Sequence, residues 1–172
     1  PSTLRDVSLV ADKSLPVDAY AIRVAGESQI PRSPGAIRRV ILEPGDPPAH
    51  PEAIRAVLGA EMIVIGPGSL YTSILPNLLV PDLVEAIRAS RALKVYVCNV
   101  ATQPGETDEY DCLRHLSALE DHVGAGLVDL VLANDHYEGQ LPEGVNWVCV
   151  EQGTGSMVPV HSSDLVDSLH PW

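Results

Sequence analysis

Glycine and hydroxyl residues directly follow the short apolar run Met62–Ile65 and are the strongest sign of binding chemistry in the chain. The run Gly66-Pro67-Gly68-Ser69 lets the backbone turn sharply and approach a ligand closely, because glycine has no Cβ. Many α/β proteins hold phosphate or nucleotide in a glycine loop at such a strand end. A tight turn with solvated hydroxyls is the alternative interpretation. The expected ligand contacts are Gly66, Gly68, Ser69, Tyr71 and Thr72, although Tyr71 could instead cover the edge of the core.

A polar loop after the apolar residues 93–98 carries the second set of candidates, namely Asn99, Gln103, Glu106, Thr107 and Asp108. The amide of Asn99 could read a base or fix the neighbouring loop. Paired carboxylates hold hard cations such as Mg²⁺, so Glu106 and Asp108 are candidate metal ligands. In the alternative interpretation, Thr107 caps the following helix and Asp108 favours its dipole. The loop is therefore expected to contact a ligand or to begin a helix.

The third apolar run, residues 128–133, ends in Asn134-Asp135-His136. We expect Asn134 to contact the ligand. Asp135 either adds a carboxylate to the Mg²⁺ site or begins a turn. His136 is a possible general base, but the sequence indicates no partner for it.

Two other histidines and one cysteine are expected to be inert. His115 and His122 lie seven residues apart on one predicted helix, without a metal-ligand spacing, so exposure to solvent is expected. Cys98 is expected to be a core thiol. The three cysteines have no metal-ligand spacing, so reduced thiols are expected.

The elements that position these residues form a βαβαβ pattern. Strands are predicted at residues 62–65, 93–98 and 128–133, and helices at residues 51–58, 81–91 and 108–123. A parallel sheet with right-handed crossovers follows from this alternation. All three strands would then end at one edge, where we place the site. The first strand is expected to be buried on both faces.

Shorter elements flank this pattern. A hairpin is predicted from strands at residues 6–11 and 18–25, joined by residues 13–17, and a further strand at residues 37–42. One helical turn at residues 70–75 should end at Pro76. Strands at residues 147–150 and 157–160, with a turn at 153–155 between them, precede a last helix. That helix begins at Ser162 or Ser163 and reaches Leu169.

Composition restricts the possible partners. A chain of 172 residues with 45% apolar residues fits one globular domain. Its net charge of −12 argues against a nucleic-acid partner, which needs a basic face. No apolar run approaches the length of a membrane span, so no membrane association and a cytoplasmic location are expected.

Two linked motifs resemble a known family. The segments are GPGSLYTSILPN at residues 66–77 and, after Val97-Cys98-Asn99, TQPGETD at residues 102–108. They are similar to the YvcK-type gluconeogenesis factors, CofD-like proteins of the UPF0052 family. The match also includes Gly26-Glu27-Ser28 and residues 131–134 and covers most of the chain.

The resemblance implies a Rossmann-like, three-layer α/β/α fold with a mainly parallel sheet, to which the N-terminal β-hairpin is added. It also implies binding of a nucleotide or a nucleotide-sugar such as UDP-GlcNAc. The implied role is regulatory and cytoplasmic, linking carbon metabolism to cell-wall synthesis and cell shape. The related 2-phospho-L-lactate transferases instead carry out Mg²⁺-dependent phospholactyl transfer, and a non-catalytic interaction domain is a third possibility.

The chain departs from the family in one respect. Family members are longer, and their glycine-rich nucleotide loop, Gly-Gly-Gly-Thr-Gly, lies in the amino-terminal half; this sequence contains no such run. We therefore expect one CofD-like α/β domain over residues 1–172 that corresponds to the carboxyl-terminal portion. An uncovered sheet edge and core face should then favour a homo-oligomer.

Overall fold

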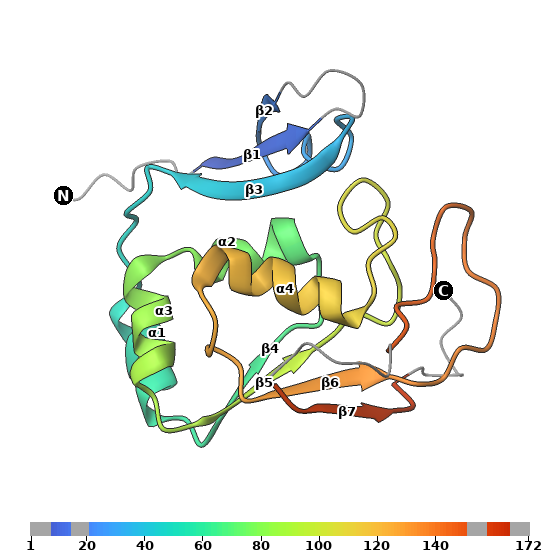
Figure 1. Cartoon of the computed structure of the whole chain (residues 1–172). Helices are drawn as coiled ribbons and strands as arrows, with labels where there is room; N and C mark the ends of the chain where they lie inside the picture. Colours follow the sequence, from blue (N-terminus) through green and yellow to red (C-terminus); the bar gives the residue numbers. More distant parts are fainter. Residues whose placement is uncertain (1–7, 15–20, 151–157, 166–172) are drawn as a thin grey trace.

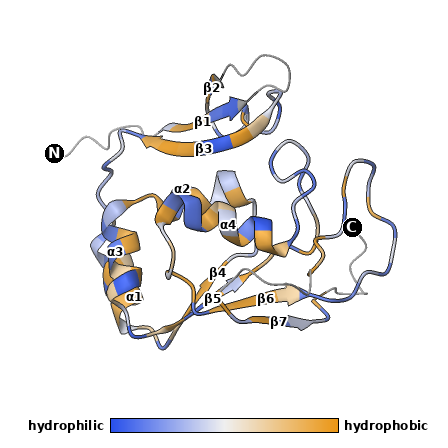
Figure 2. Ribbon diagram, viewed as in Figure 1, coloured by the Kyte–Doolittle hydropathy of each residue, from blue (hydrophilic) through white to orange (hydrophobic). Residues whose placement is uncertain are grey.

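The computed structural model describes residues 8–14, 21–150 and 158–165 of the chain. It contains an antiparallel sheet, a set of helices and a parallel sheet, and α2 and α4 lie between the two sheets (Figure 1). The hydropathy colouring shows apolar residues along β3 and β6, on the two sides of these helices (Figure 2). Buried residues of both sheets and of the helices form one hydrophobic cluster. The predicted α/β class is confirmed.

The parallel sheet consists of β4 (Met62–Ile65), β5 (Leu93–Val97), β6 (Leu130–Asn134) and β7 (Val160–Ser163), in that order. Every neighbouring pair is parallel. The predicted βαβαβ pattern is therefore confirmed, and the carboxyl ends of its three strands meet at one edge of the sheet. The fourth strand begins three residues later than predicted, and Ser162 and Ser163 lie within it instead of capping a helix.

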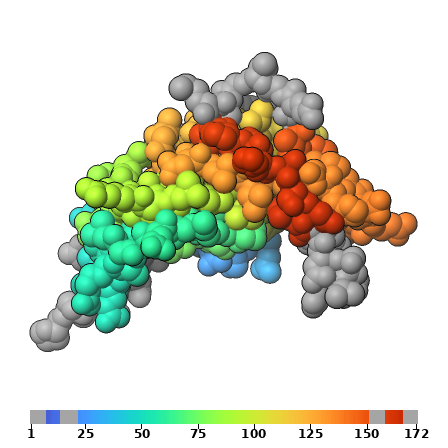
Figure 3. Space-filling view, turned by 90° about the horizontal axis from the view of Figure 1, so that it is seen from below, coloured from blue at the N-terminus to red at the C-terminus, as the bar shows by residue number. Residues whose placement is uncertain are grey.

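The expectation that the first of these strands is buried on both faces is wrong. Met62 and Val64 are 56% and 57% exposed, because β4 is an edge strand and no described helix covers its far face. Leu93, which pairs with Met62 in register, is 43% exposed. Figure 3 views the molecule from this side of the sheet.

The antiparallel sheet consists of β1 (Ser8–Ser14), β2 (Ala21–Ala25) and β3 (Ala36–Glu43), in the order β2-β1-β3. The predicted hairpin is confirmed by the pairing of β1 with β2. Lys13 was expected in the connection between these strands but lies within β1 and is fully buried. The register of β1 with β3 shifts between Asp12 and Lys13.

The helices are α1 (Pro51–Gly59), α2 (Leu75–Leu78), α3 (Pro81–Ala89) and α4 (Cys112–Val123). A π-helical turn, Leu70–Ile74, runs directly into α2. Pro76 does not end this segment, because it lies in the first turn of α2, where a missing N–H costs little. None of the described helices is long and apolar enough to cross a membrane on its own. The segments Leu70–Leu78 and Pro81–Ala89, which are bent by 74° relative to each other, reach the length and apolar composition of a membrane span only when taken together.

Helix α4 begins later than predicted and its cap is different. Asp111 caps it, and the side-chain Oδ1 of Asp111 accepts a hydrogen bond from Arg114 N at 2.6 Å. Thr107 is therefore not the cap. Gly124 ends the helix with φ +82°, as the sequence indicated.

The expected exposure of His115 and His122 is also wrong. His115 is fully buried, and its Nδ1 donates to the carbonyl of Asp111 at 2.8 Å. His122 is half-buried; its Nδ1 donates to the Ala118 carbonyl, and its Nε2 accepts from Val40 N at 3.0 Å. Helix α4 packs under the antiparallel sheet, so these histidines face the core. Burial lowers the pKa of both.

The carboxyl-terminal expectations are met only in part. Residues 147–150 form no strand and contribute only an isolated bridge between Trp147 and Ala101. The predicted turn at 153–155 and most of the predicted last helix lie outside the described residues.

Candidate functional site

The glycine loop after β4 is tied to the end of β5. Gly68 N donates to Asn99 Oδ1, and Asn99 Nδ2 donates to Gly68 O, each at 3.0 Å. Gly66 has φ +82°, and a Cβ there would lie 2.7 Å from the carbonyl oxygen of Val97. Only glycine fits at that position. Of the two roles left open for Asn99, the structure has the amide fixing the neighbouring loop, and the Gly68 N–H already has this partner.

Glu106 is the centre of a second set of hydrogen bonds in the same region. Its Oε1 accepts from Thr72 Oγ1 at 2.8 Å and from Gln103 Nε2 at 2.9 Å. Its Oε2 accepts from Tyr71 N at 3.3 Å. Burial raises the pKa of Glu106, and the hydrogen bonds from Thr72 and Tyr71 oppose that shift. The carboxylate occupies the amino end of the π-helical turn, where it accepts from the free backbone N–H of Tyr71.

Ser69 and Gln103 join these two sets of contacts. Ser69 Oγ donates to Gln103 Oε1 at 2.6 Å, while the amide nitrogen of Gln103 donates to Glu106. Both side chains are partly exposed. Gly68, Thr72 and Asn99 are also partly exposed, so a ligand could reach this whole group at the strand ends.

The loop that carries Glu106 is held in place by Lys13. The Nζ of Lys13 donates to the carbonyls of Ile30 at 2.8 Å, Ser33 at 2.7 Å and Gly105 at 3.2 Å. Burial lowers the pKa of Lys13, and the charges of Asp108 and Glu106 oppose that shift. Gly105 has φ +79°, and a Cβ there would lie 2.0 Å from the carbonyl oxygen of Pro31. Sequence reasoning missed Lys13, because it placed this residue in a turn.

Three of the residues predicted to contact a ligand are buried, and their side chains hydrogen-bond to other groups of the protein. Tyr71 is 2% exposed, and its hydroxyl hydrogen-bonds to that of Tyr110 at 2.8 Å. Thr107 is fully buried, and its Oγ1 accepts from Gln103 N at 2.9 Å. Asn134 is 1% exposed; its Nδ2 donates to the His136 carbonyl, and its Oδ1 accepts from Leu165 N. These side chains position the loops at the strand ends.

The carboxylates suggested for Mg²⁺ do not form a cluster. Glu106 uses both oxygens within the protein, and Asp108 Oδ2 accepts from Gly105 N at 2.9 Å. Asp135 is exposed at the end of β6. Across residues 8–14, 21–150 and 158–165, no three His, Cys, Asp or Glu side chains are grouped to hold a metal. The arrangement of these three carboxylates does not fit a metal centre.

His136 and Cys98 have partners that the sequence did not show. The imidazole of His136 lies 3.7 Å from Glu138 and 3.9 Å from Asp164. Cys98 is buried as expected, and hydrogen bonding with Cys112 together with burial holds its pKa well above the ordinary value. Both effects favour the protonated thiol at Cys98.

A pocket of about 760 Å³ lies at the carboxyl edge of β4 and β5. One wall is the glycine loop with Asn99 and Gln103, and the other comes from Leu141, Pro142, Val145 and Leu165. No charged side chain lines it within the described part of the chain. Such a pocket suits a flat, uncharged group such as a nucleobase or a ribose. The second wall was missed from the sequence, because its loop carries no motif.

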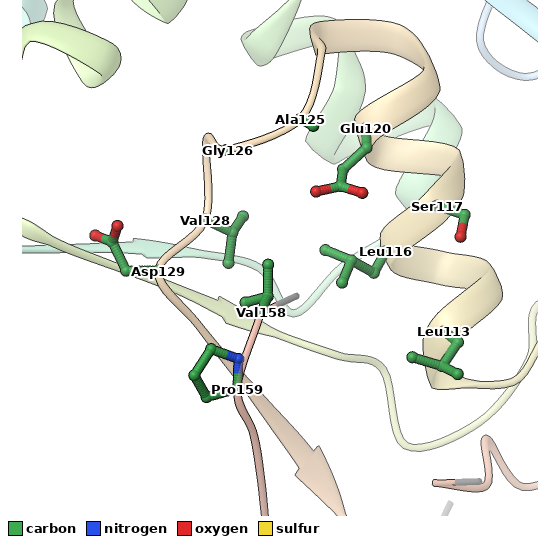
Figure 4. Close-up of a pocket in the computed structure, with 10 residues that line it drawn as sticks. All are labelled: Leu113, Leu116, Ser117, Glu120, Ala125, Gly126, Val128, Asp129, Val158 and Pro159. Atoms are coloured by element: carbon green, nitrogen blue, oxygen red, sulfur yellow. The ribbon is translucent and has the colours of Figure 1, made fainter. Parts of the chain in front are cut away.

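A second cavity, of about 750 Å³, lies between α4 and the segments that precede β6 and β7 (Figure 4). Leu113, Leu116 and Val128 contribute apolar walls, and Glu120 and Asp129 contribute carboxylates. This cavity adjoins the amino end of β6. Ligands of parallel α/β sheets bind at the carboxyl ends of the strands, and all the predicted contacts lie there. We therefore assign the candidate site to the first pocket.

Comparison with known proteins gives a consistent result. The family described as 2-phospho-L-lactate transferase CofD matches residues 1–149. The chain is 55% identical over 111 residues to the gluconeogenesis factor of Halalkalibacterium halodurans and 51% identical over 111 residues to that of Bacillus subtilis. These matches cover 64% of this chain and 34% and 35% of the two relatives. The chain thus spans about a third of the length of these relatives.

A longer match is to the putative gluconeogenesis factor of Thermoanaerobacterium thermosulfurigenes, at 46% identity over 146 residues, covering 83% of this chain and 42% of the relative. Among solved structures, a UPF0052-family protein from Bacillus halodurans superimposes with a TM-score of 0.82 at 40% sequence identity. That match covers 95% of this chain and 54% of the other.

Proposed function

The chain belongs to the CofD family, and from this premise we propose that it binds a nucleotide or a nucleotide-sugar of the UDP-GlcNAc type at the carboxyl edge of its parallel sheet. Its proposed role is that of a cytoplasmic, non-catalytic regulator of the gluconeogenesis-factor type. Occupancy of the site would report the supply of a cell-wall precursor and so link carbon metabolism to cell-wall synthesis and cell shape.

The uncharged pocket beside Gly68 and Asn99 is the observation that carries this proposal. Its volume of about 760 Å³ lies within the range of about 300–1,000 Å³ typical of small-molecule sites. The walls are mainly apolar, and the polar groups at its rim are the amides of Asn99 and Gln103 and the hydroxyl of Ser69. A uracil ring would lie between apolar walls with amide groups at its edge.

Titration with nucleotides tests this assignment. Isothermal calorimetry of UDP-GlcNAc, UDP and GDP against the chain should give saturable binding of the two uridine nucleotides. The substitution Val145→Trp places a large side chain in the pocket and should abolish binding. A matched control is Leu113→Trp, which places the same side chain in the cavity of Figure 4 and should leave affinity unchanged. Equal affinity in wild type and Val145→Trp would contradict the proposal.

The second candidate function is phospholactyl transfer, which the description of the matching family favours. That reaction would require Mg²⁺ and a guanylylated donor. Preferential binding of GDP over UDP in the same calorimetric series, increased by added Mg²⁺, would favour the transferase.

A further inference from the structure

A second, polar cleft of about 450 Å³ adjoins the apolar pocket. Ser69 and Gln103 line both spaces, so their 2.6 Å hydrogen bond forms the boundary between them. The other polar groups of the cleft are the hydroxyls of Ser28, Thr72 and Ser73 and the carboxylates of Glu27 and Glu106. The cleft thus joins the loop after β2 to the π-helical turn after β4.

Three of these side chains are available to a ligand. Glu27, Ser28 and Ser73 are exposed, and none of their side chains hydrogen-bonds to another residue in the part of the chain that the structure describes. Thr72 and Glu106, in contrast, bond to each other. The cleft therefore presents the Glu27 carboxylate and the Ser28 hydroxyl from the loop after β2 and the Ser73 hydroxyl from the π-helical turn, beside the hydrogen-bonded pair Thr72 and Glu106.

Charge restricts the class of ligand. No lysine or arginine is among the described residues of the cleft, and the nearby ammonium of Lys13 is used by three backbone carbonyls. An anion such as phosphate thus has no counter-charge inside the cleft, so the diphosphate of a nucleotide-sugar would have to lie outside it, at the Ser69–Gln103 boundary. A metal cation would find only the Glu27 carboxylate, because both oxygens of Glu106 accept hydrogen bonds from the protein. Uncharged alcohols are the class of ligand that remains, since a hydroxyl group can donate a hydrogen bond to a carboxylate and accept one from serine.

We infer that this cleft binds an uncharged, polyhydroxylated group, such as a sugar ring, while the apolar pocket on the other side of the Ser69–Gln103 pair binds the base. The inference rests on the proposed function, because the cleft would hold the sugar of the same nucleotide-sugar whose base lies in the apolar pocket. Glu27 accepts hydrogen bonds from hydroxyls of the group, and Ser28 and Ser73 donate to it.

Nuclear magnetic resonance of the ¹⁵N-labelled chain distinguishes the two spaces. N-acetylglucosamine alone should shift the amide signals of Ser28 and Ser73 at millimolar concentrations, and UDP alone should shift those of Gly68 and Val100. UDP-GlcNAc should shift both sets. Sugar-induced shifts at Ser28 and Ser73 without any effect of UDP would leave the cleft supported and refute the base pocket. The absence of shifts at Ser28 and Ser73 with both sugar-containing probes would overturn the inference.

The double substitution Ser28→Ala and Ser73→Ala gives the matching affinity test. It removes two exposed hydroxyls that have no described partner, so the fold should be unaffected. Affinity for UDP-GlcNAc should fall about tenfold, which corresponds to about 1.4 kcal/mol, while the response to UDP stays as in wild type. Ser117→Ala, an exposed serine of α4, is the control. An unchanged affinity for UDP-GlcNAc in the double variant would count against the cleft.

Discussion

Asn99 and Gly68 exchange two hydrogen bonds of 3.0 Å, so the side-chain amide of one pairs with the backbone of the other. This pair connects the loops that follow β4 and β5 and sets the rim of the apolar pocket. The amide uses both its donor and its acceptor, which no other side chain of this size and charge can do.

The first prediction concerns Asn99→Asp. The carboxylate cannot donate to Gly68 O and would face that carbonyl oxygen with a negative charge. We expect the free energy of unfolding to fall by about 1 kcal/mol, the lower end of the cost of an unsatisfied polar group, because the pair is only part-buried, and nucleotide affinity to fall with it. Chemical denaturation and calorimetry measure both. Asp135→Asn, an isosteric change at the exposed end of β6, is the control; wild-type values for Asn99→Asp would contradict the pairing.

The glycine loop itself is tested by Gly68→Val. Gly68 has φ +157°, where side chains are rarely tolerated, and valine would add bulk at the pocket rim. Affinity for UDP-GlcNAc should fall about a hundredfold or more, which corresponds to about 2.7 kcal/mol. Ser69→Ala should cost about tenfold, because it removes one hydroxyl. Equal affinities and equal melting temperatures in all three proteins would mean that the loop is only a turn.

The buried ammonium of Lys13 should be a major source of stability. Lys13→Met keeps the length of the side chain but leaves the carbonyls of Ser33 and Gly105 without this donor, and the Ile30 carbonyl keeps only its 3.4 Å bond from Ser33 N. We expect a loss of about 2 kcal/mol or more in the free energy of unfolding, at about 1–3 kcal/mol for each of the two orphaned carbonyls. Arg38→Met, an exposed cation in β3, should change it little. Thermal and denaturant unfolding report the difference, and comparable stability of both variants would refute the role of Lys13.

His122 should destabilise the protein in acid. Its Nε2 accepts from Val40 N, so the folded state needs the neutral imidazole, and burial lowers its pKa below the ordinary value of 6.5. Stability from this group is present above pH 6.5 and is lost as pH falls through the lower folded pKa. The variant His122→Gln should lack this component in a series of denaturation curves from pH 7.5 to 4.5. Parallel curves for both proteins would contradict it.

The exposed apolar face of β4 predicts self-association. Met62, Val64 and Leu93 leave apolar surface open on one face of a parallel sheet, and such sheets are normally covered on both faces. We propose that a second copy of the chain covers it. Val64→Lys should shift sedimentation equilibrium toward the monomer, whereas Leu58→Lys, an equally exposed position on α1, should not. A wild-type monomer at high concentration would exclude this interface.

The sequence by itself determined the order and type of the main elements. The apolar run Met62–Ile65, bounded by Gly66, is a strand with those same bounds. The alternation with helices required a parallel sheet and brought the ends of β4, β5 and β6 to one edge. Such features depend on local periodicity and on turn residues, which can be read directly from neighbouring positions.

Only the tertiary structure decided which polar groups face a ligand. Tyr71, Thr107 and Asn134 have the residue types of a binding site, yet they are buried and bonded within the protein. Asn99 finds its partner 31 positions away, and the Lys13 ammonium bonds to Gly105, 92 positions away. A buried polar group must be satisfied by whatever the fold brings beside it. For that reason, contacts between distant segments decide which residues hold the site together and which residues line it. The local sequence does not encode these contacts.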